Sequence, residues 1–348
     1  MVGLLAVLAA GCTASPGPEA GPARVDVRAA SLKEGFGTMD RLVEAAKKEG
    51  SLTVIGLARD WANYGEIIAA FRDAYGIEVK SVEPTASSRR QIAVADTVKP
   101  DVFDLTLDVA VANAHRFARY RTTTWQDIPD HLKDPAGAWY AAYGGYMSIG
   151  YDPRRVPAPR SFADLTRPGY KVALPGDPRQ AAAAFSAVMA ASLRTGRPDA
   201  KAGVDLFARL RAAGALVPPA QATAVVDWDH RNAAYAAEVN EGRDEPVWQV
   251  VVPADAVLGA YHVQAINKNA PHPAAARLWQ EFLFSDEGQN LFLKGYARPV
   301  RMEAMQMNGT LDTEAAARLP RAPGAPVLLT VPEIDKARSY IRTHWAAR

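Results

Sequence analysis

Acidic and aromatic side chains recur at the ends of predicted strands in this chain of 348 residues. Asp60, Trp61 and Tyr64 follow the β-rich run at residues 52–55 within a short loop. Aromatic faces attract cations, and a buried ammonium group needs a carboxylate partner. We therefore expect the loop to form one wall of a ligand cleft, although Trp61 and Tyr64 could instead fold back onto the core. Comparable strand-end positions hold Asp108, Asp177, Gln180, Asp227, Trp228 and Asp229.

A second kind of chemistry is offered by the hydroxyl-rich segment at residues 85–90. Ser87 and Ser88 lie at the start of a predicted helix that runs to about residue 98. Serine commonly caps a helix N-terminus, and the same N-terminus can bind an anion. The segment therefore predicts either a cap or a site for the anionic end of a ligand.

The elements that must position these side chains alternate between strand and helix. The run at residues 52–55 is followed by a helix with Ile67, Ile68 and Phe71 at helical spacing, by Gly76 as a C-terminal cap, and by a strand at residues 77–79. Strand, loop, helix and strand in this order predict a parallel pair whose loops gather at the carboxyl edge of the sheet, where open α/β sheets bind ligands. The same order returns at residues 170–193. The length and this alternation predict an α/β protein with two lobes.

Composition and motifs argue against several other classes of protein. The formal net charge of +2 gives no strongly basic surface for nucleic acid. The six histidines show no metal-ligand spacing, and neither a nucleophile elbow nor a phosphate-binding loop follows a strand. Asp227 and Asp229 could be paired acids for glycoside chemistry, but nothing else supports that interpretation. We expect no catalytic activity, no cofactor and no resident metal.

The N-terminus resembles the export signal of bacterial lipoproteins. An apolar run ends in Leu8-Ala-Ala-Gly-Cys12, which is similar to a lipobox, although no Lys or Arg precedes it. The resemblance implies that Cys12 is lipidated and that the protein is anchored at the outer face of a membrane in the cell envelope. Residues 13–38 include a segment rich in Pro, Gly and Ala, and we expect a flexible tether there.

Three further segments resemble bacterial extracellular solute-binding proteins of ABC importers. They are Trp61-Ala-Asn-Tyr64 with Tyr75-Gly-Ile-Glu-Val79, Gly176-Asp-Pro-Arg179, and the stretch from Gln264 to Gln289 that contains Leu278-Trp279 and Ser285-Asp-Glu-Gly-Gln289. The likeness extends over residues 39–301 and is strongest to the branch that binds polyamines, ferric iron, thiamine or aminoethylphosphonate. It implies two lobes of the type II periplasmic-binding fold that close on a solute and deliver it to a membrane permease with its ATPase.

The likeness to polyamine binders also implies particular site residues. Trp61, Tyr64, Asp177, Trp228 and Tyr261 match aromatic or acidic positions of that group, whereas Gln180 and Val263 replace acids. A polyamine-like amine is therefore favoured, with Asp60, Asp108, Asp227 and Asp229 as further carboxylates. The missing acids fit equally a zwitterion or anion such as aminoethylphosphonate that uses Ser87 and Ser88. Ferric iron and thiamine stay as alternatives, and an enzyme or a sensor module on the same fold is also possible.

These observations predict the organisation of the whole chain. Residues 1–12 form the signal peptide, 13–38 the tether, 39–148 the first part of lobe 1, 149–261 lobe 2, and 262–348 the return to lobe 1 with C-terminal helices. We expect a monomer whose partners are a small-molecule ligand, a permease and its ATPase, and a membrane reached through the lipid anchor.

Overall fold

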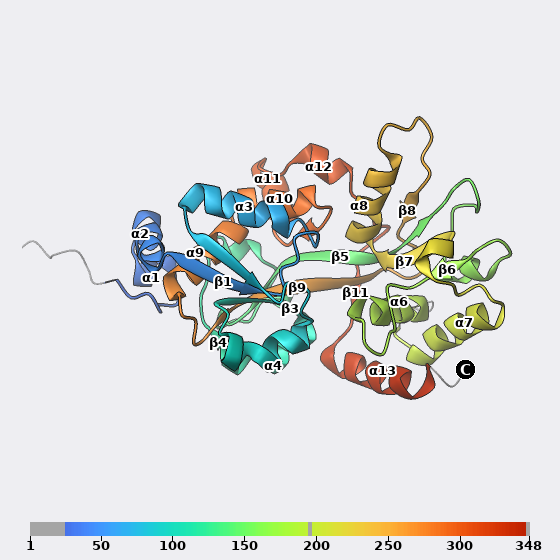
Figure 1. The fold of residues 1–348 in the computed structure, drawn as a ribbon, viewed down its shortest axis with the longest axis horizontal. Coiled ribbons are helices and arrows are strands. Elements are labelled where there is room, and N and C mark those ends of the chain that lie inside the picture. Colours follow the sequence, from blue (N-terminus) through green and yellow to red (C-terminus); the bar gives the residue numbers. More distant parts are fainter. Residues whose placement is uncertain (1–24, 194–196, 346–348) are drawn as a thin grey trace, which may run out of the picture.

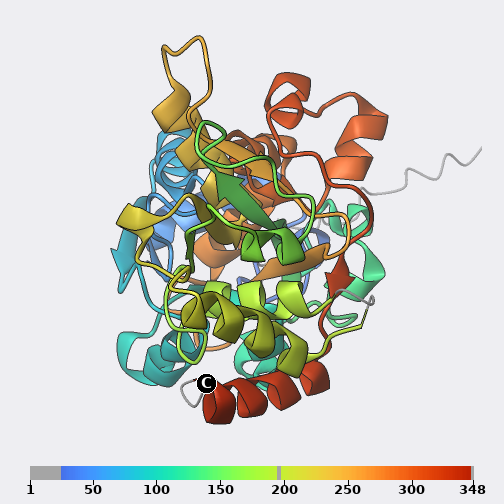
Figure 2. The ribbon, with the colours of Figure 1, turned by 90° about the vertical axis from the view of Figure 1, so that its right-hand side faces the viewer.

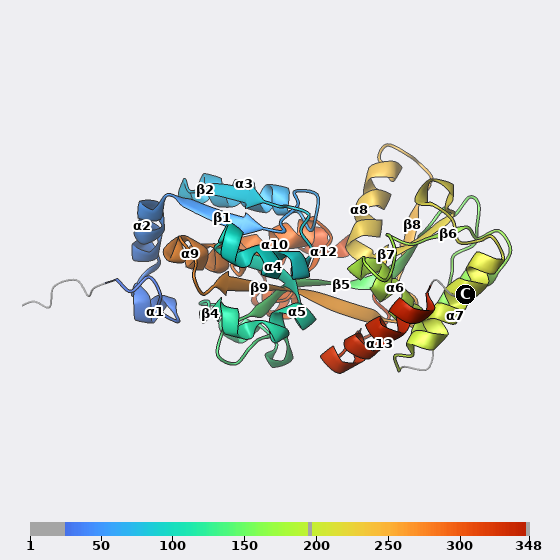
Figure 3. The same cartoon turned by 60° about the horizontal axis from the view of Figure 1, so that its bottom comes forward.

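The computed structural model describes residues 25–193 and 197–345, which form two α/β lobes (Figures 1 and 3). Lobe 1 contains α1 (Leu32–Gly35), α2 (Met39–Glu49), β1 (Ser51–Ile55), α3 (Tyr64–Tyr75), β2 (Glu78–Val82), α4 (Ser88–Val98), β3 (Val102–Thr106), α5 (Leu107–Ala112), β4 (Phe117–Ala118), α9 (Pro273–Leu283), α10 (Asp286–Lys294), β10 (Arg298–Pro299), α11 (Met302–Asn308) and α12 (Thr313–Ala317). Lobe 2 contains β6 (Val172–Ala173), α6 (Ala182–Ser192), α7 (Ala200–Ala212), β7 (Ala224–Trp228), α8 (Asp229–Asn240), β8 (Gln249–Val251), β11 (Val327–Leu328) and α13 (Val331–His344). The predicted two-lobe α/β fold is confirmed.

Two long strands, β5 (Tyr140–Tyr151) and β9 (Leu258–Asn267), connect the lobes. The hydrogen-bonded order β2-β1-β3-β9-β5-β7-β6 passes through both lobes without interruption. The first half of β5, up to Tyr146, pairs with β9, and the second half, from Met147, pairs with β7. The lobes therefore meet where β5 changes its partner, and Figure 3 shows both strands running across this junction.

The segment β1–α3–β2 forms the parallel unit that its sequence predicts. Ser51 pairs with Glu78 and Ile55 with Val82 in parallel register. Ile67, Ile68 and Phe71 are buried on one side of α3, as their helical spacing requires. Gly76 ends the helix with a φ of 67°, a left-handed conformation that glycine adopts without steric cost.

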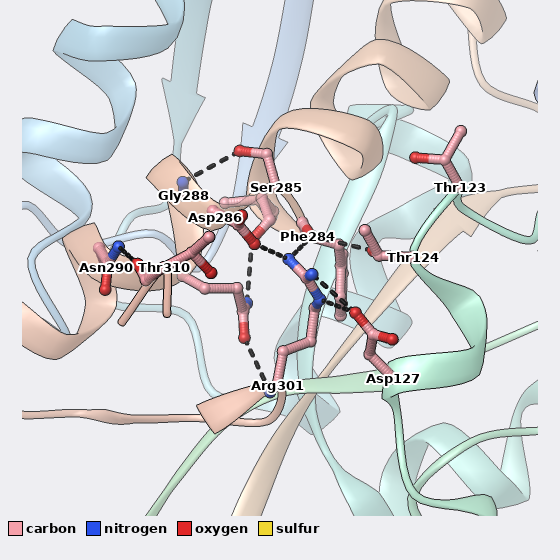
Figure 4. A network of polar contacts seen from close by, with 12 residues as sticks. Thr123, Thr124, Asp127, Phe284, Ser285, Asp286, Gly288, Asn290, Arg301 and Thr310 are labelled. Atoms are coloured by element: carbon pink, nitrogen blue, oxygen red, sulfur yellow. Dashed lines mark hydrogen bonds and ion pairs between the residues drawn. The ribbon is translucent and has the colours of Figure 1, made fainter. Parts of the chain in front are cut away.

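The segment Ser285–Gln289 has a structural role in lobe 1. The Ser285 hydroxyl caps α10 by accepting from the N–H of Gly288 at 3.1 Å. Nearby, the buried Arg301 guanidinium contacts Asp127 at 2.7 Å, Asp286 at 2.9 Å and the carbonyl of Phe284 at 2.7 Å (Figure 4). One charged side chain thus joins the end of β10 to the α9–α10 junction and to the loop before β5.

The last helix, α13, packs on lobe 2, whereas the sequence assigns residues 262–348 to the return to lobe 1 with C-terminal helices. The rings of Phe207 in α7 and Trp345 at the end of α13 lie 5.9 Å apart, and Arg211 donates to the carbonyl of Trp345 at 3.0 Å. Ala337 and Ile341 are buried in the hydrophobic core of lobe 2. Figure 2 shows α13 beside α7 at the edge of this lobe.

The packed part of lobe 1 begins earlier than the sequence predicts. Residues 25–38, expected as part of the tether, include α1, and Phe36 is buried in the core of lobe 1. The apolar side chains of Val25 and Val27 pack against that core, which is the physical reason for the shorter tether. Cys12 and the signal peptide lie outside the described residues. No helix among the residues that the structure describes has the length and apolar character needed to cross a bilayer.

Candidate functional site

A cleft of about 510 Å³ lies between the lobes, at the carboxyl ends of β1, β3 and β7. Lobe 1 contributes the β1–α3 loop, the start of α4 and the start of α5, whereas lobe 2 contributes α6, the end of β7 and part of α13. Residues from Leu258 to His262 of β9 complete the lining. Most lining side chains are apolar or aromatic, including Trp61, Leu107, Phe185, Trp228, Tyr261, Leu329 and Ile334. The cleft therefore suits a small organic molecule with an apolar body.

Trp61 is held in place by a chain of hydrogen bonds. Its indole N–H donates to the Tyr143 hydroxyl at 2.7 Å, and this hydroxyl donates to the Asp104 carboxylate at 2.8 Å. The His262 ring contacts the other oxygen of Asp104 at 3.1 Å and stacks on Tyr143, with centroids 5.1 Å apart. His230 packs edge-on against Trp61, and burial together with His262 and Arg231 lowers its pKa to about 3, so the imidazole is neutral. The network fixes the indole plane at the cleft wall.

Two ion pairs extend across the cleft from lobe 1 to lobe 2. Asp60 lies 3.8 Å from Arg231 of α8, and Asp108 lies 3.2 Å from Arg338 of α13. The first pair is exposed, so it contributes little to stability, whereas Asp108 is 9 % exposed and Arg338 is 28 % exposed. In both pairs the acid belongs to lobe 1 and the guanidinium to lobe 2.

Asp227 is different from the other carboxylates that line the cleft. It forms no ion pair with any of the described residues, and its carboxylate accepts only the N–H of Trp228, at 2.8 Å. Burial raises its pKa to about 6, against the opposing effects of that hydrogen bond and of Arg231. Asp227 is thus a half-buried acid that lines the cleft and feels the charge of Arg231 without forming an ion pair with any of the described residues.

The two serines at the start of α4 line the cleft, and both oxygens already accept a backbone hydrogen bond. Ser87 caps the helix by accepting from Arg90 at 3.3 Å, and Ser88 accepts from the N–H of Thr106 at 2.9 Å. These bonds use oxygen lone pairs and leave the hydroxyl protons available as donors.

Eight of the twelve predicted site residues line the cleft, and four do not. Those that line it are Asp60, Trp61, Ser87, Ser88, Asp108, Asp227, Trp228 and Tyr261. Tyr64 is fully buried at the start of α3, where its hydroxyl accepts from Gln264 at 2.9 Å, so it is a core residue. Asp177 accepts from the N–H and side chain of Arg179 within its own turn, and Gln180 is exposed beside it.

Asp229 is the fourth residue that does not line the cleft. The predicted strand ends at Trp228, and α8 begins at Asp229, so the chain turns the second carboxylate away from the first. Asp229 accepts from the N–H groups of Tyr146 and His230 and pairs with Arg298 of lobe 1 at 3.0 Å. Asp227 and Asp229 therefore do not form a pair of acids for glycoside chemistry.

Four ionisable residues of the cleft were not among the predicted site residues. Asp104 could have been found as the acid inside the otherwise apolar run Val102–Leu105, and His262 as the polar side chain beside Tyr261. Arg231 and Arg338 have no such local signal, because charged residues on helices normally face solvent. Among the described residues, no group of three or more His, Cys, Asp or Glu side chains is placed to hold a metal ion.

Comparisons with known proteins concern the fold and the family of the chain. A comparison with curated sequences found no significant match. Among solved structures, iron-bound HitA from Pseudomonas aeruginosa is similar, with 18% identity, a TM-score of 0.61, and coverage of 84% of this chain and 98% of that one. AfuA from Actinobacillus pleuropneumoniae with fructose-6-phosphate has 18% identity, a TM-score of 0.62 and coverage of 86% and 99%. AgtB from A. tumefaciens R10 with agropinic acid has 14% identity, a TM-score of 0.62 and coverage of 85% and 99%.

At these identities the structural likeness establishes the fold alone. The sequence itself is more specific, because residues 101–322 match the family described as bacterial extracellular solute-binding protein. That range contains the two connecting strands and the cleft residues from Asp104 to His262. The predicted resemblance is confirmed, and the chain belongs to the family of bacterial extracellular solute-binding proteins.

Proposed function

We propose that the protein captures a small organic amine with an apolar body and delivers it to the permease of an ABC importer. The amine is released unchanged, without chemistry on the solute. Closure of the two lobes around the cleft would enclose the ligand, with β5 and β9 as the strands about which the lobes move.

The observation that carries this proposal is the unbalanced carboxylate of Asp227. Asp60 and Asp108 each have an arginine partner, and Asp104 is bound by Tyr143 and His262. A ligand ammonium group would give Asp227 the direct ion pair that the described part of the chain does not supply, since Arg231 acts on it without such a contact. The neighbouring indole of Trp228 adds an aromatic surface for the carbon chain and the cation.

This reasoning favours one ammonium group over the two or more of a polyamine. The acid and amide expected at the second ammonium, Asp177 and Gln180, lie outside the cleft lining. Val263, which replaces an acid of the polyamine binders, is fully buried. A second ammonium would therefore have to compete with Arg231 or Arg338 for an acid that is already paired.

We also propose that Cys12 carries a lipid and holds the protein at the outer face of a membrane, where a permease can receive the solute. Support comes from the sequence Leu8–Cys12 and from the family, whose members are extracellular. We expect the protein to act as a monomer, because each chain contains both lobes and a complete cleft.

A ligand screen tests the proposal. We would measure thermal stabilisation of the full chain with alkylamines, polyamines, amino acids, thiamine, aminophosphonates and ferric salts, and then determine affinities by calorimetry. We expect a primary amine to bind and to be recovered unchanged, with a stabilisation of roughly 2.7 kcal/mol at a hundredfold excess over its Kd.

Two matched variants connect the binding to the cleft. Asp227→Asn keeps the shape of the side chain and should weaken amine binding by roughly tenfold or more, because a hydrogen bond to a charged group contributes about 1.5–3 kcal/mol. Asp177→Asn, which removes an acid outside the cleft lining, should bind like the native protein. Tight binding of ferric ion without any amine, or equal effects of the two variants, would contradict the proposal.

A further inference from the structure

The C-terminal helix supplies a wall of the cleft that lies outside the part of the chain matched to the family. The match ends at residue 322, whereas Leu328, Leu329, Ile334 and Arg338 line the cleft. The segment is firmly attached to lobe 2, since β11 pairs with β9 and Trp345 is bound by Arg211 and Phe207. Any ligand enclosed in the cleft would meet this wall.

Arg338 is the only cationic side chain on this wall within the described residues, and its donors are only partly used. One terminal nitrogen donates to Asp108 at 3.2 Å, while Nε is buried and has no hydrogen-bond partner. The guanidinium lies over the Phe185 ring, 5.0 Å from its centroid, which holds the plane of the group. The side chain lines the cleft and is 28 % exposed, so its terminal nitrogens, and not the buried Nε, are the donors that a guanidinium held in this way can offer to an oxyanion.

The opposite wall has further groups suited to an anion. Ser88, whose oxygen accepts from Thr106, lies close to the start of α5, which carries Asp108. Its hydroxyl proton and that of Ser87 remain available as donors at the N-terminal end of α4. Arg89, in the first turn of the same helix, is outside the cleft lining but adds positive charge near Arg338: burial is the main cause that lowers the pKa of that guanidinium, and Arg89 adds to it against Asp108 and Asp335.

We infer that Arg338 is a specificity-determining residue that binds an oxyanion of the ligand, so that the captured amine is a zwitterion. The ammonium group would meet Asp227, while the carboxylate or phosphonate would accept from the terminal nitrogens of Arg338 and weaken its contact with Asp108. This inference rests on the proposed function, since it adds an anionic group to the proposed amine.

A matched pair of ligand series tests the inference. Calorimetry with the full chain would compare the ω-amino acids from glycine to aminohexanoic acid with the alkylamines of the same length. We expect the native protein to prefer the best ω-amino acid to its matched amine by roughly tenfold or more, as charge-assisted hydrogen bonds predict. Arg338→Gln should bring this preference close to one, whereas Arg342→Gln, which removes an exposed charge from the same helix, should preserve it.

Asp108→Asn provides an independent variant, in case Arg338→Gln fails to fold. Removing the competing carboxylate should raise the preference for ω-amino acids, and an unchanged or lower preference would count against the inference. Equal binding of both series by the native protein, or an unaltered preference in Arg338→Gln, would overturn the role of Arg338 but leave an amine binder. Absence of binding by every compound in both series would overturn the proposed function as well.

Discussion

The raised pKa of Asp227 predicts that amine binding depends on pH in a defined direction. The pKa of the folded protein is about 6, above the usual value of 3.8, because burial disfavours the charged carboxylate. An ammonium ligand requires the ionised form, whereas an alkylammonium group itself stays protonated throughout this range. Affinity should therefore be constant above pH about 7 and should fall as the pH drops through about 6.

The size of the effect follows from the fraction of ionised carboxyl groups. At a pH one unit below a pKa, ~10 % of the groups carry charge, so the apparent affinity falls about tenfold, or about 1.4 kcal/mol.

The stability of the apo protein should depend on pH in the opposite direction, because it decreases as the pH rises. Asp227 favours the folded state while it is protonated, and that advantage is lost as the pH rises from about 3.8 through about 6. At neutral pH, Asp227→Asn should therefore stabilise the apo protein, by roughly 3 kcal/mol at most, because folding raises the pKa from 3.8 to about 6.

Calorimetric titration of the tightest-binding alkylamine at several pH values would test this reasoning. Buffers with different ionisation enthalpies would reveal release of a proton on binding below pH about 6. Asp227→Asn should bind weakly at every pH, without the pH-dependent loss, and should unfold at a higher temperature than the native apo protein. A native affinity that stays constant below pH about 6, or the same pH dependence in the variant, would refute the assignment of Asp227.

The remaining predictions concern aromatic contacts, the core of lobe 1 and the anchor. Trp61→Ala and Trp228→Ala should each weaken amine binding by about 0.5–2 kcal/mol, and calorimetry showing unchanged affinity in both would place the ligand elsewhere. Arg301→Ala should lower the free energy of unfolding by about 3 kcal/mol because it empties a buried site and removes the donors to Asp127, Asp286 and the Phe284 carbonyl, and a urea titration showing a loss under about 1 kcal/mol would contradict this. Cys12→Ala should move the protein from the membrane fraction to the soluble fraction, and unchanged fractionation would exclude lipidation.

The fold was predictable because local sequence signals agree with the tertiary structure along much of the chain. The run from Leu52 to Val79 combines a β-rich segment, an amphipathic helix and a capping glycine, and all three appear where expected. The main difference is at residues 25–38. Their composition is typical of a tether, but a few apolar side chains such as Phe36 are enough to attach them to lobe 1.

The site was less predictable because strand-end position alone does not determine the direction of a side chain. Tyr64 belongs to the same loop-and-helix start as Trp61, yet α3 turns it into the core. The carboxylate of Asp177 accepts hydrogen bonds from the N–H and the guanidinium of Arg179 within a local turn. The position of Arg179 two residues later in the sequence could have predicted this contact. Arg338 could not be predicted from its surroundings, because only the tertiary packing of α13 brings it to the cleft.

The distribution of charge between the lobes connects ligand choice with closure. Both ion pairs across the cleft place the acid on lobe 1 and the arginine on lobe 2, so the lobes attract each other even without a solute. A ligand can shift the equilibrium toward closure only by the difference in its affinity for the two states. A simple cation at Asp227 would contact mainly lobe 2, whereas a zwitterion bound to Asp227 and Arg338 of lobe 2 would bring its oxyanion to the hydroxyl donors of Ser87 and Ser88 on lobe 1 in place of Asp108. Solutes that replace the Asp108–Arg338 contact by equal or stronger contacts to both lobes are therefore the ones that the closed cleft can retain.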